Sequence, residues 1–142
     1  MVTKLRRTAL VLGAAALAAC SLPLEADPHP EGVRITVDRA AYAPGDTVAA
    51  RLVNDSEATL GYNLCFSTLE RQEGADWIVA DEPLMICTAD LKALHPGESV
   101  AHRRGLPAGL ESGRYRLRTR VEFPLTGGER ATVRSATFVV DR

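Results

Sequence analysis

The sequence predicts an all-β protein, a β-sandwich of seven to nine short antiparallel strands. Apolar and polar residues alternate with a period of two through most of the chain after residue 32. Turn signals rich in Gly, Pro, Asn and Asp recur roughly every 8–12 residues, which is typical of sandwiches. A single stretch, residues 89–94, has helical character, enough for about one turn.

The first half of the domain shows the alternation from its first strand onward. Val33, Ile35 and Val37 alternate with polar residues, and Ala43-Pro44-Gly45-Asp46 comes next as a turn signal. In the third strand, Cys65 falls on the face opposite the apolar residues. The expected strands cover residues 33–37, 48–52, 60–66, 69–72 and 77–80, with a short edge strand at 84–88.

The second half contains the longest expected strand. His95-Pro96-Gly97-Glu98 repeats the earlier turn signal, and Thr126-Gly127-Gly128-Glu129 reads as a hairpin turn. The strands are expected at residues 99–103, 115–123 and 131–140. Because Val133 and Phe138 differ in parity, the last strand should contain a bulge near Ser135 or Ala136.

The N-terminus predicts export. Residues 1–19 carry Lys4, Arg6 and Arg7 near their start and continue with an apolar run, the pattern of a signal peptide. That run is about eleven residues, too short to span a bilayer, which needs roughly 20. Leu17-Ala18-Ala19-Cys20 resembles the lipobox of bacterial lipoproteins. The resemblance implies that Cys20 is acylated and becomes the first residue of a membrane-anchored chain. Neutral Ser21 then implies an outer-membrane location facing the periplasm. The alternative is an ordinary cut after Ala19, with Cys20 an incidental thiol.

The chain after the signal peptide is a short tether and one mildly acidic domain. Residues 20–32, rich in Pro and acidic residues, read as the tether, and residues 33–142 as the domain. Without residues 1–19 the chain has 14 basic and 18 acidic residues, a net charge of −4. This balance does not indicate a nucleic-acid partner, and membrane contact should depend on the lipid anchor.

With Cys20 assigned to lipid, Cys65 and Cys87 remain as an even pair. In an oxidising compartment such a pair usually forms a disulfide. The alternative is a metal site that adds a His, but neither a CxxC nor an HxxxH spacing is present. The sequence therefore favours a disulfide and implies no metal or cofactor.

Leu110-x-x-Gly113-x-Tyr115 matches the tyrosine-corner pattern of immunoglobulin-like domains. The wider order of motifs resembles bacterial immunoglobulin-like domains of small exported lipoproteins. Those motifs are Tyr42 to Asp46, Asn54 to Ser56, Leu69 to Arg71, Trp77, Pro96 to Glu98, and Gly113 to Tyr115. The resemblance implies an immunoglobulin-like sandwich in which the Tyr115 hydroxyl bonds to upstream backbone. The cysteines and Trp77 depart from the antibody pattern, because they do not occupy its central bridge and core positions.

No catalytic constellation is evident. Ser99 lies in Gly97-Glu98-Ser99-Val100-Ala101, which lacks the final glycine of a nucleophile elbow. The three histidines, His29, His95 and His102, are expected to be solvated or capping side chains. Asp81 and Glu82 are adjacent in extended chain, so they point to opposite faces and are poor acid–base partners.

A basic stripe alternates with the core residues of the longest strand. Arg114, Arg116, Arg118 and Arg120 should share its outer face. The favoured interpretation is a solvated sheet face with counter-charges on neighbouring strands. The alternative is a docking face for an acidic partner or a glycan.

These observations predict a non-enzymatic, membrane-anchored envelope lipoprotein that serves protein interaction or structural support, with an envelope protein as its partner. The alternative function is a binding module with a defined target, such as a protease inhibitor acting through the Cys65–Cys87 loop. The oligomeric state does not follow from the sequence.

Overall fold

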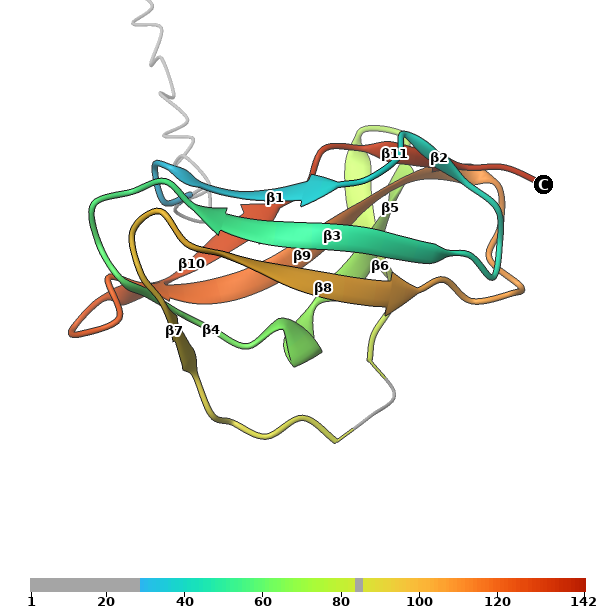
Figure 1. Ribbon diagram of the computed structural model, residues 1–142. Coiled ribbons are helices and arrows are strands. Elements are labelled where there is room, and N and C mark those ends of the chain that lie inside the picture. The colour runs from blue at the N-terminus through green and yellow to red at the C-terminus, as the bar shows by residue number, and fades with distance from the viewer. Residues whose placement is uncertain (1–28, 84–85) are drawn as a thin grey trace, which may run out of the picture.

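The computed structural model describes residues 29–83 and 86–142 (Figure 1). The predicted signal peptide, Cys20 and most of the predicted tether lie outside these residues. The described chain forms two sheets with a shared core, and its one helix is the 3-10 turn η1 (Leu64–Phe66). No helix in this part of the chain is long and apolar enough to cross a membrane.

The smaller sheet has the order β1-β3-β8, with both pairs antiparallel. Its strands are β1 (Val33–Val37), β3 (Thr47–Asn54) and β8 (Ser99–Gly105). Figure 1 shows these three strands side by side, in front of the second sheet. The alternation in β3 turns Val48, Ala50 and Leu52 toward the core, as predicted.

The larger sheet is organised around β9 (Gly113–Phe123), the longest strand. The other members are β2 (Ala41–Tyr42), β4 (Leu60–Tyr62), β5 (Thr68–Glu73), β6 (Asp76–Asp81), β7 (Lys92–Leu94), β10 (Glu129–Arg134) and β11 (Phe138–Val140). Strand β9 pairs with β4 and β5 on one side and with β10 and β11 on the other. One pairing departs from the antiparallel prediction. The chain passes from the smaller to the larger sheet between β1 and β2, and β2 then runs parallel to β11.

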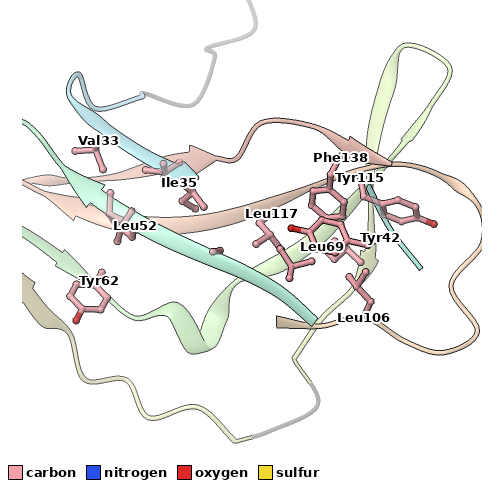
Figure 2. Close-up of a cluster of buried hydrophobic side chains, with 14 of the residues drawn as sticks. Val33, Ile35, Tyr42, Leu52, Tyr62, Leu69, Leu106, Tyr115, Leu117 and Phe138 are labelled. Atoms are coloured by element: carbon pink, nitrogen blue, oxygen red, sulfur yellow. The ribbon is translucent and has the colours of Figure 1, made fainter. Parts of the chain in front are cut away.

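The core lies between the sheets (Figure 2). Phe138 is its aromatic centre, with ring centroids 5.1 Å from Tyr42 and 6.4 Å from Tyr115. Leu52 from the smaller sheet and Leu117 from β9 are almost fully buried. Burying a large apolar side chain contributes about 1.5–3 kcal/mol, so this cluster is the main source of the fold's stability.

The predicted strand over residues 60–66 is interrupted. It ends at Tyr62, and η1 separates it from β5. The Asn63 side-chain oxygen accepts a hydrogen bond from the Cys65 amide at 3.1 Å, which closes a local turn in place of ladder bonds. Both β4 and β5 pair with β9, so they act as one strand with an insertion, and Cys65 lies in that insertion.

Two further expectations in this region were wrong. Residues 89–94 do not form a helical turn, because residues 92–94 form β7 and pair with β4. The segment contains good helix formers, but strand pairing overrides that weak propensity. The expected edge strand at 84–88 lies partly outside the described residues, and residues 86–88 are not a strand.

The bulge predicted near Ser135 is confirmed. Arg134 pairs with Arg118 and Phe138 with Tyr115, so three residues on one strand oppose two on β9. Ser135 fills the gap, because its hydroxyl accepts a hydrogen bond from the Leu117 amide at 2.9 Å. Counting β4 with β5 and β10 with β11 as single strands reduces the eleven strands of the described residues to nine.

The tyrosine corner is also confirmed. The Tyr115 hydroxyl donates a 2.7 Å hydrogen bond to the Glu111 carbonyl oxygen, while the ring is buried in the core. Together with the two-sheet topology and the switch of the first strand between sheets, this makes the chain an immunoglobulin-like β-sandwich.

Candidate interaction site

The outer face of the larger sheet carries six arginines. The β9 register places Arg116 opposite Glu70 and Arg118 opposite Arg134, so the arginine stripe shares one face with residues of β5 and β10. We call this surface the arginine face. Its arginines are Arg114, Arg116, Arg118, Arg120, Arg130 and Arg134.

Glu70 is the counter-charge of this face. Its residue is 4% exposed, and its carboxylate lies 2.7 Å from Arg116 Nε and 3.3 Å from Arg118 Nη1. Arg134 Nε is 4.0 Å away. A buried carboxylate needs such partners, because desolvation of an unpaired charge is costly. The predicted counter-charge on a neighbouring strand is therefore present.

Pairing divides the stripe into two parts. Arg116 also stacks on the outer-face ring of Trp77, with its guanidinium carbon 4.0 Å from the ring centroid, so Trp77 is not a core residue. Arg116 and Arg118 are thus held in place by contacts within the protein. Arg114 and Arg120 are exposed, and within residues 29–83 and 86–142 neither makes an ion pair.

A pocket of about 590 Å3 opens beside the Arg120 end of the stripe. Apolar side chains line it, among them Phe66, Val79 and Leu91, each of which is more than 40% exposed. Its charged lining is mixed and consists of Arg118, Arg120, Arg130, Glu82 and Glu122. The pocket therefore combines apolar walls with charges of both signs.

The predicted disulfide forms one wall of this pocket. Cys65 in η1 and Cys87 are joined, with 5.7 Å between their Cα atoms, and Cys87 lines the pocket. The bond ties residues 86–91 to the interruption between β4 and β5. Asn63 supports the same segment, because its amide nitrogen donates to the carbonyl oxygens of Thr88 and Asp90 at 2.6 and 3.0 Å.

A second hollow of about 420 Å3 is lined by both cysteines of the disulfide and by residues of β8. His102 lines it from β8. Burial lowers the pKa of His102, and the nearby Arg104 charge lowers it further. The His102 side chain is half-buried, whereas the sequence suggested a solvated or capping side chain.

Arg104 connects the edges of the two sheets. Its guanidinium pairs with the carboxylate of Asp81 at the end of β6, and both side chains are less than one-quarter exposed. An inward-facing charge on an edge strand such as β8 also discourages unwanted strand pairing.

The residues considered for catalysis contact different parts of the described chain and not one another. The Ser99 hydroxyl accepts a hydrogen bond from Arg51 at 2.9 Å and lies on the face of β8 opposite His102. His95 contacts the Thr59 hydroxyl at 3.1 Å, and His29 contacts the Thr132 carbonyl at 3.4 Å. Within the described residues, no three or more His, Cys, Asp or Glu side chains are grouped to hold a metal ion.

Sequence reasoning did not find Glu70, Arg130 or the pocket. Alternation alone places Glu70 and Leu69 on opposite faces of the same strand. The order of the strands is needed to place Glu70 beside Arg116 and Arg118. The pocket depends on η1, which the alternating pattern of residues 60–66 conceals.

No protein-family model matches the chain, and no curated protein matches it in sequence. Two similar solved structures are the archaellum periplasmic stator protein FlaG from Sulfolobus acidocaldarius and the ASH/PapD-like domain 7 of human CEP192. FlaG is 20% identical with a TM-score of 0.39, over 72% of this chain and 98% of FlaG. The CEP192 domain is 17% identical with a TM-score of 0.37, over 91% of this chain and 96% of that domain. At TM-scores this low the two similarities do not indicate a function. The fold is described from the strand pairing within the two sheets.

Proposed function

We propose that this chain is an exported lipoprotein that binds a protein partner and catalyses no reaction. Cys20 anchors it in the envelope membrane, with the sandwich facing the periplasm, and the pocket beside the arginine face is the binding surface. The observation that carries the proposal is the lining of that pocket, where exposed Phe66, Val79 and Leu91 lie beside Arg120 and Arg130.

A protein partner fits this chemistry better than a nucleic acid. Hot spots of protein interfaces are apolar anchors that fill a pocket inside a polar, charged rim. Nucleic-acid sites carry positive charge throughout, whereas Glu82 and Glu122 share this pocket with the arginines. The partner should present an apolar side chain flanked by acidic groups, which would pair with Arg120 and Arg130.

Charge reversal tests the binding surface. The double variant Arg120→Glu/Arg130→Glu should reduce the amount of partner that co-purifies after reversible crosslinking of intact cells by about tenfold or more, equivalent to about 1.4 kcal/mol. The matched control is Arg51→Glu/Arg103→Glu on the smaller sheet, which changes the net charge equally and should keep the partner. Equal recovery from both double variants would contradict the proposed surface.

Metabolic labelling tests the anchor separately. Cells that express the full chain and receive radiolabelled palmitate should incorporate the label, and Cys20→Ala should abolish incorporation. Label that persists in Cys20→Ala would refute Cys20 as the acylated residue, whatever the pocket binds.

A second candidate function has its own observation. Ile86 is fully exposed and lies next to the disulfide-bonded Cys87. An exposed apolar residue in a loop fixed by a crosslink is the arrangement expected of an inhibitor's binding loop. If the chain inhibits a protease through this loop, envelope proteases should be inhibited at micromolar protein and Ile86→Asp should remove the effect. No inhibition by the wild-type chain would eliminate this candidate.

A further inference from the structure

Strand β6 is an edge strand with an unusual composition. In the described residues it pairs only with β5, so its other edge is free. Its centre is Trp77-Ile78-Val79-Ala80, in which Ile78 is 42% and Val79 46% exposed. Natural edge strands usually carry charges, Pro or bulges that block pairing with other chains.

The other long edge strands carry charges along their length. Strand β8 carries His102, Arg103 and Arg104, and β10 carries Arg130 and Arg134. In β6 the charges are limited to Asp76 and Asp81 at its ends, and Asp81 is already paired with Arg104. The strand has a bulge at Ala80, but it lies beyond Val79 and leaves Trp77 to Val79 regularly paired with β5. The centre of β6 is therefore apolar, exposed and free of charge.

The hairpin register determines which backbone groups of β6 point outward. Gly74 and Ala75 form a two-residue turn, so Glu73 and Asp76 are a hydrogen-bonded pair. Pairs then alternate along the hairpin, and Trp77 and Val79 fall in the non-hydrogen-bonded positions opposite Gln72 and Glu70. The amide and carbonyl groups of Trp77 and Val79 consequently face the free edge.

We propose that a second copy of this chain pairs with β6, antiparallel and about a two-fold axis at Ile78. The sequence of β6 is self-complementary in this register. Trp77 lies opposite Val79 of the second copy on both sides of the axis, and aromatic–β-branched pairs stabilise antiparallel sheets. Ile78 meets Ile78 of the second copy in a non-hydrogen-bonded pair.

The same register keeps the acidic residues apart. Asp76 lies opposite Ala80 of the second copy, so no two carboxylates face each other across the strands. Pairing in this way joins the two larger sheets edge to edge and brings the exposed Ile78 side chains of the two copies into contact. A closed two-fold contact also leaves no further β6 edge free for a third copy. The contact is small, so the dimer should be reversible.

Cysteine crosslinking tests the register in the full chain. In non-hydrogen-bonded pairs the Cα atoms are about 4.5 Å apart, which a disulfide can span. Ile78→Cys should therefore yield a disulfide-linked dimer in intact cells on a non-reducing gel. Ala80→Cys is the matched control in the same strand, because its two copies would lie four residues apart, about 13 Å at the rise of a strand. It should remain uncrosslinked.

Sedimentation tests the dimer without added thiols. The detergent-solubilised full chain should pass from one copy to two as its concentration rises from micromolar to millimolar. Ile78→Lys should remain one copy at every concentration, because it places like charges on the axis. Val139→Lys, at an equally exposed apolar position of β11, should dimerise like wild type.

Several outcomes would overturn the proposal. A wild-type chain that stays monomeric at millimolar concentration would do so, as would equal crosslinking of Ile78→Cys and Ala80→Cys. A crosslink from Ile78→Cys to a protein of a different mass would show that a foreign strand occupies this edge.

Discussion

The Arg116 guanidinium Nε lies 2.7 Å from a carboxylate oxygen of Glu70, a residue that is only 4% exposed. Because Arg116 and Arg118 neutralise a charge within the protein, only part of the arginine stripe is available to a partner. The arginines available to a partner are Arg114 and Arg120 on β9, together with Arg130 on β10. The pocket lies beside Arg120 and Arg130, at the end of the face away from Arg114.

Glu70→Gln should destabilise the domain by about 2–3 kcal/mol, because the neutral amide leaves partly buried guanidiniums without their counter-charge. Urea unfolding followed by tryptophan fluorescence measures this loss. Glu73→Gln, at an exposed position of the same strand, should change stability by less than about 0.5 kcal/mol. Equal effects of the two substitutions would show that Glu70 does not hold the face together.

Tyr115→Phe should lower stability by about 1–2 kcal/mol, because it leaves the Glu111 carbonyl without the hydroxyl that donates to it. Thermal unfolding measures the change. Tyr62→Phe is a suitable control, since the Tyr62 ring is also buried but its hydroxyl makes no hydrogen bond to the described residues. A Tyr115→Phe protein as stable as wild type would show that the tyrosine corner does not stabilise the fold.

Replacing both Cys65 and Cys87 with Ala should cost about 3 kcal/mol, the value the chain-entropy model gives for a loop of this length. The segment that forms the pocket wall would also lose its covalent tie to η1. Mass spectrometry of the non-reduced wild-type chain purified from cells should find the Cys65–Cys87 linkage. Two free thiols in that sample would contradict the bond.

Stability should fall as the pH drops below about 6.5. Because the pKa of His102 is lowered in the folded state, the unfolded chain takes up the proton more readily. The contribution of neutral His102 is thus complete above the unfolded-state pKa and is lost as the pH falls from that value through the lower folded-state pKa. His102→Gln should flatten the stability profile between pH 7.5 and 5.5 relative to wild type. Parallel profiles for the two proteins would show that His102 does not titrate as described.

The period-two alternation was sufficient to predict most strands, because burial of one sheet face requires it. Val48, Ala50 and Leu52 in β3, and Tyr115, Leu117 and Val121 in β9, turn inward as expected. Even the extra residue near Ser135 could be predicted from a change of parity, since each strand residue must face one side or the other.

The interruptions and the site depended on tertiary structure. Leu60, Tyr62, Leu64 and Phe66 alternate without a break, yet the Asn63 side chain and the disulfide draw residues 64–66 into a turn. Residues 89–94 contain good helix formers, and only pairing with β4 makes part of this segment a strand. The partners of Glu70 come from β9 and β10, so its burial could not be inferred from its own strand.

The most direct test of the proposed function is photo-crosslinking from inside the pocket in living cells. A photoreactive amino acid at Leu91 should trap one specific envelope protein, and Arg120→Glu/Arg130→Glu in the same chain should abolish that adduct. The same probe at Arg103, on the outer face of the smaller sheet, should trap none of it. Equal trapping from both positions, or an adduct unaffected by the charge reversal, would contradict the assignment of the pocket as the binding surface.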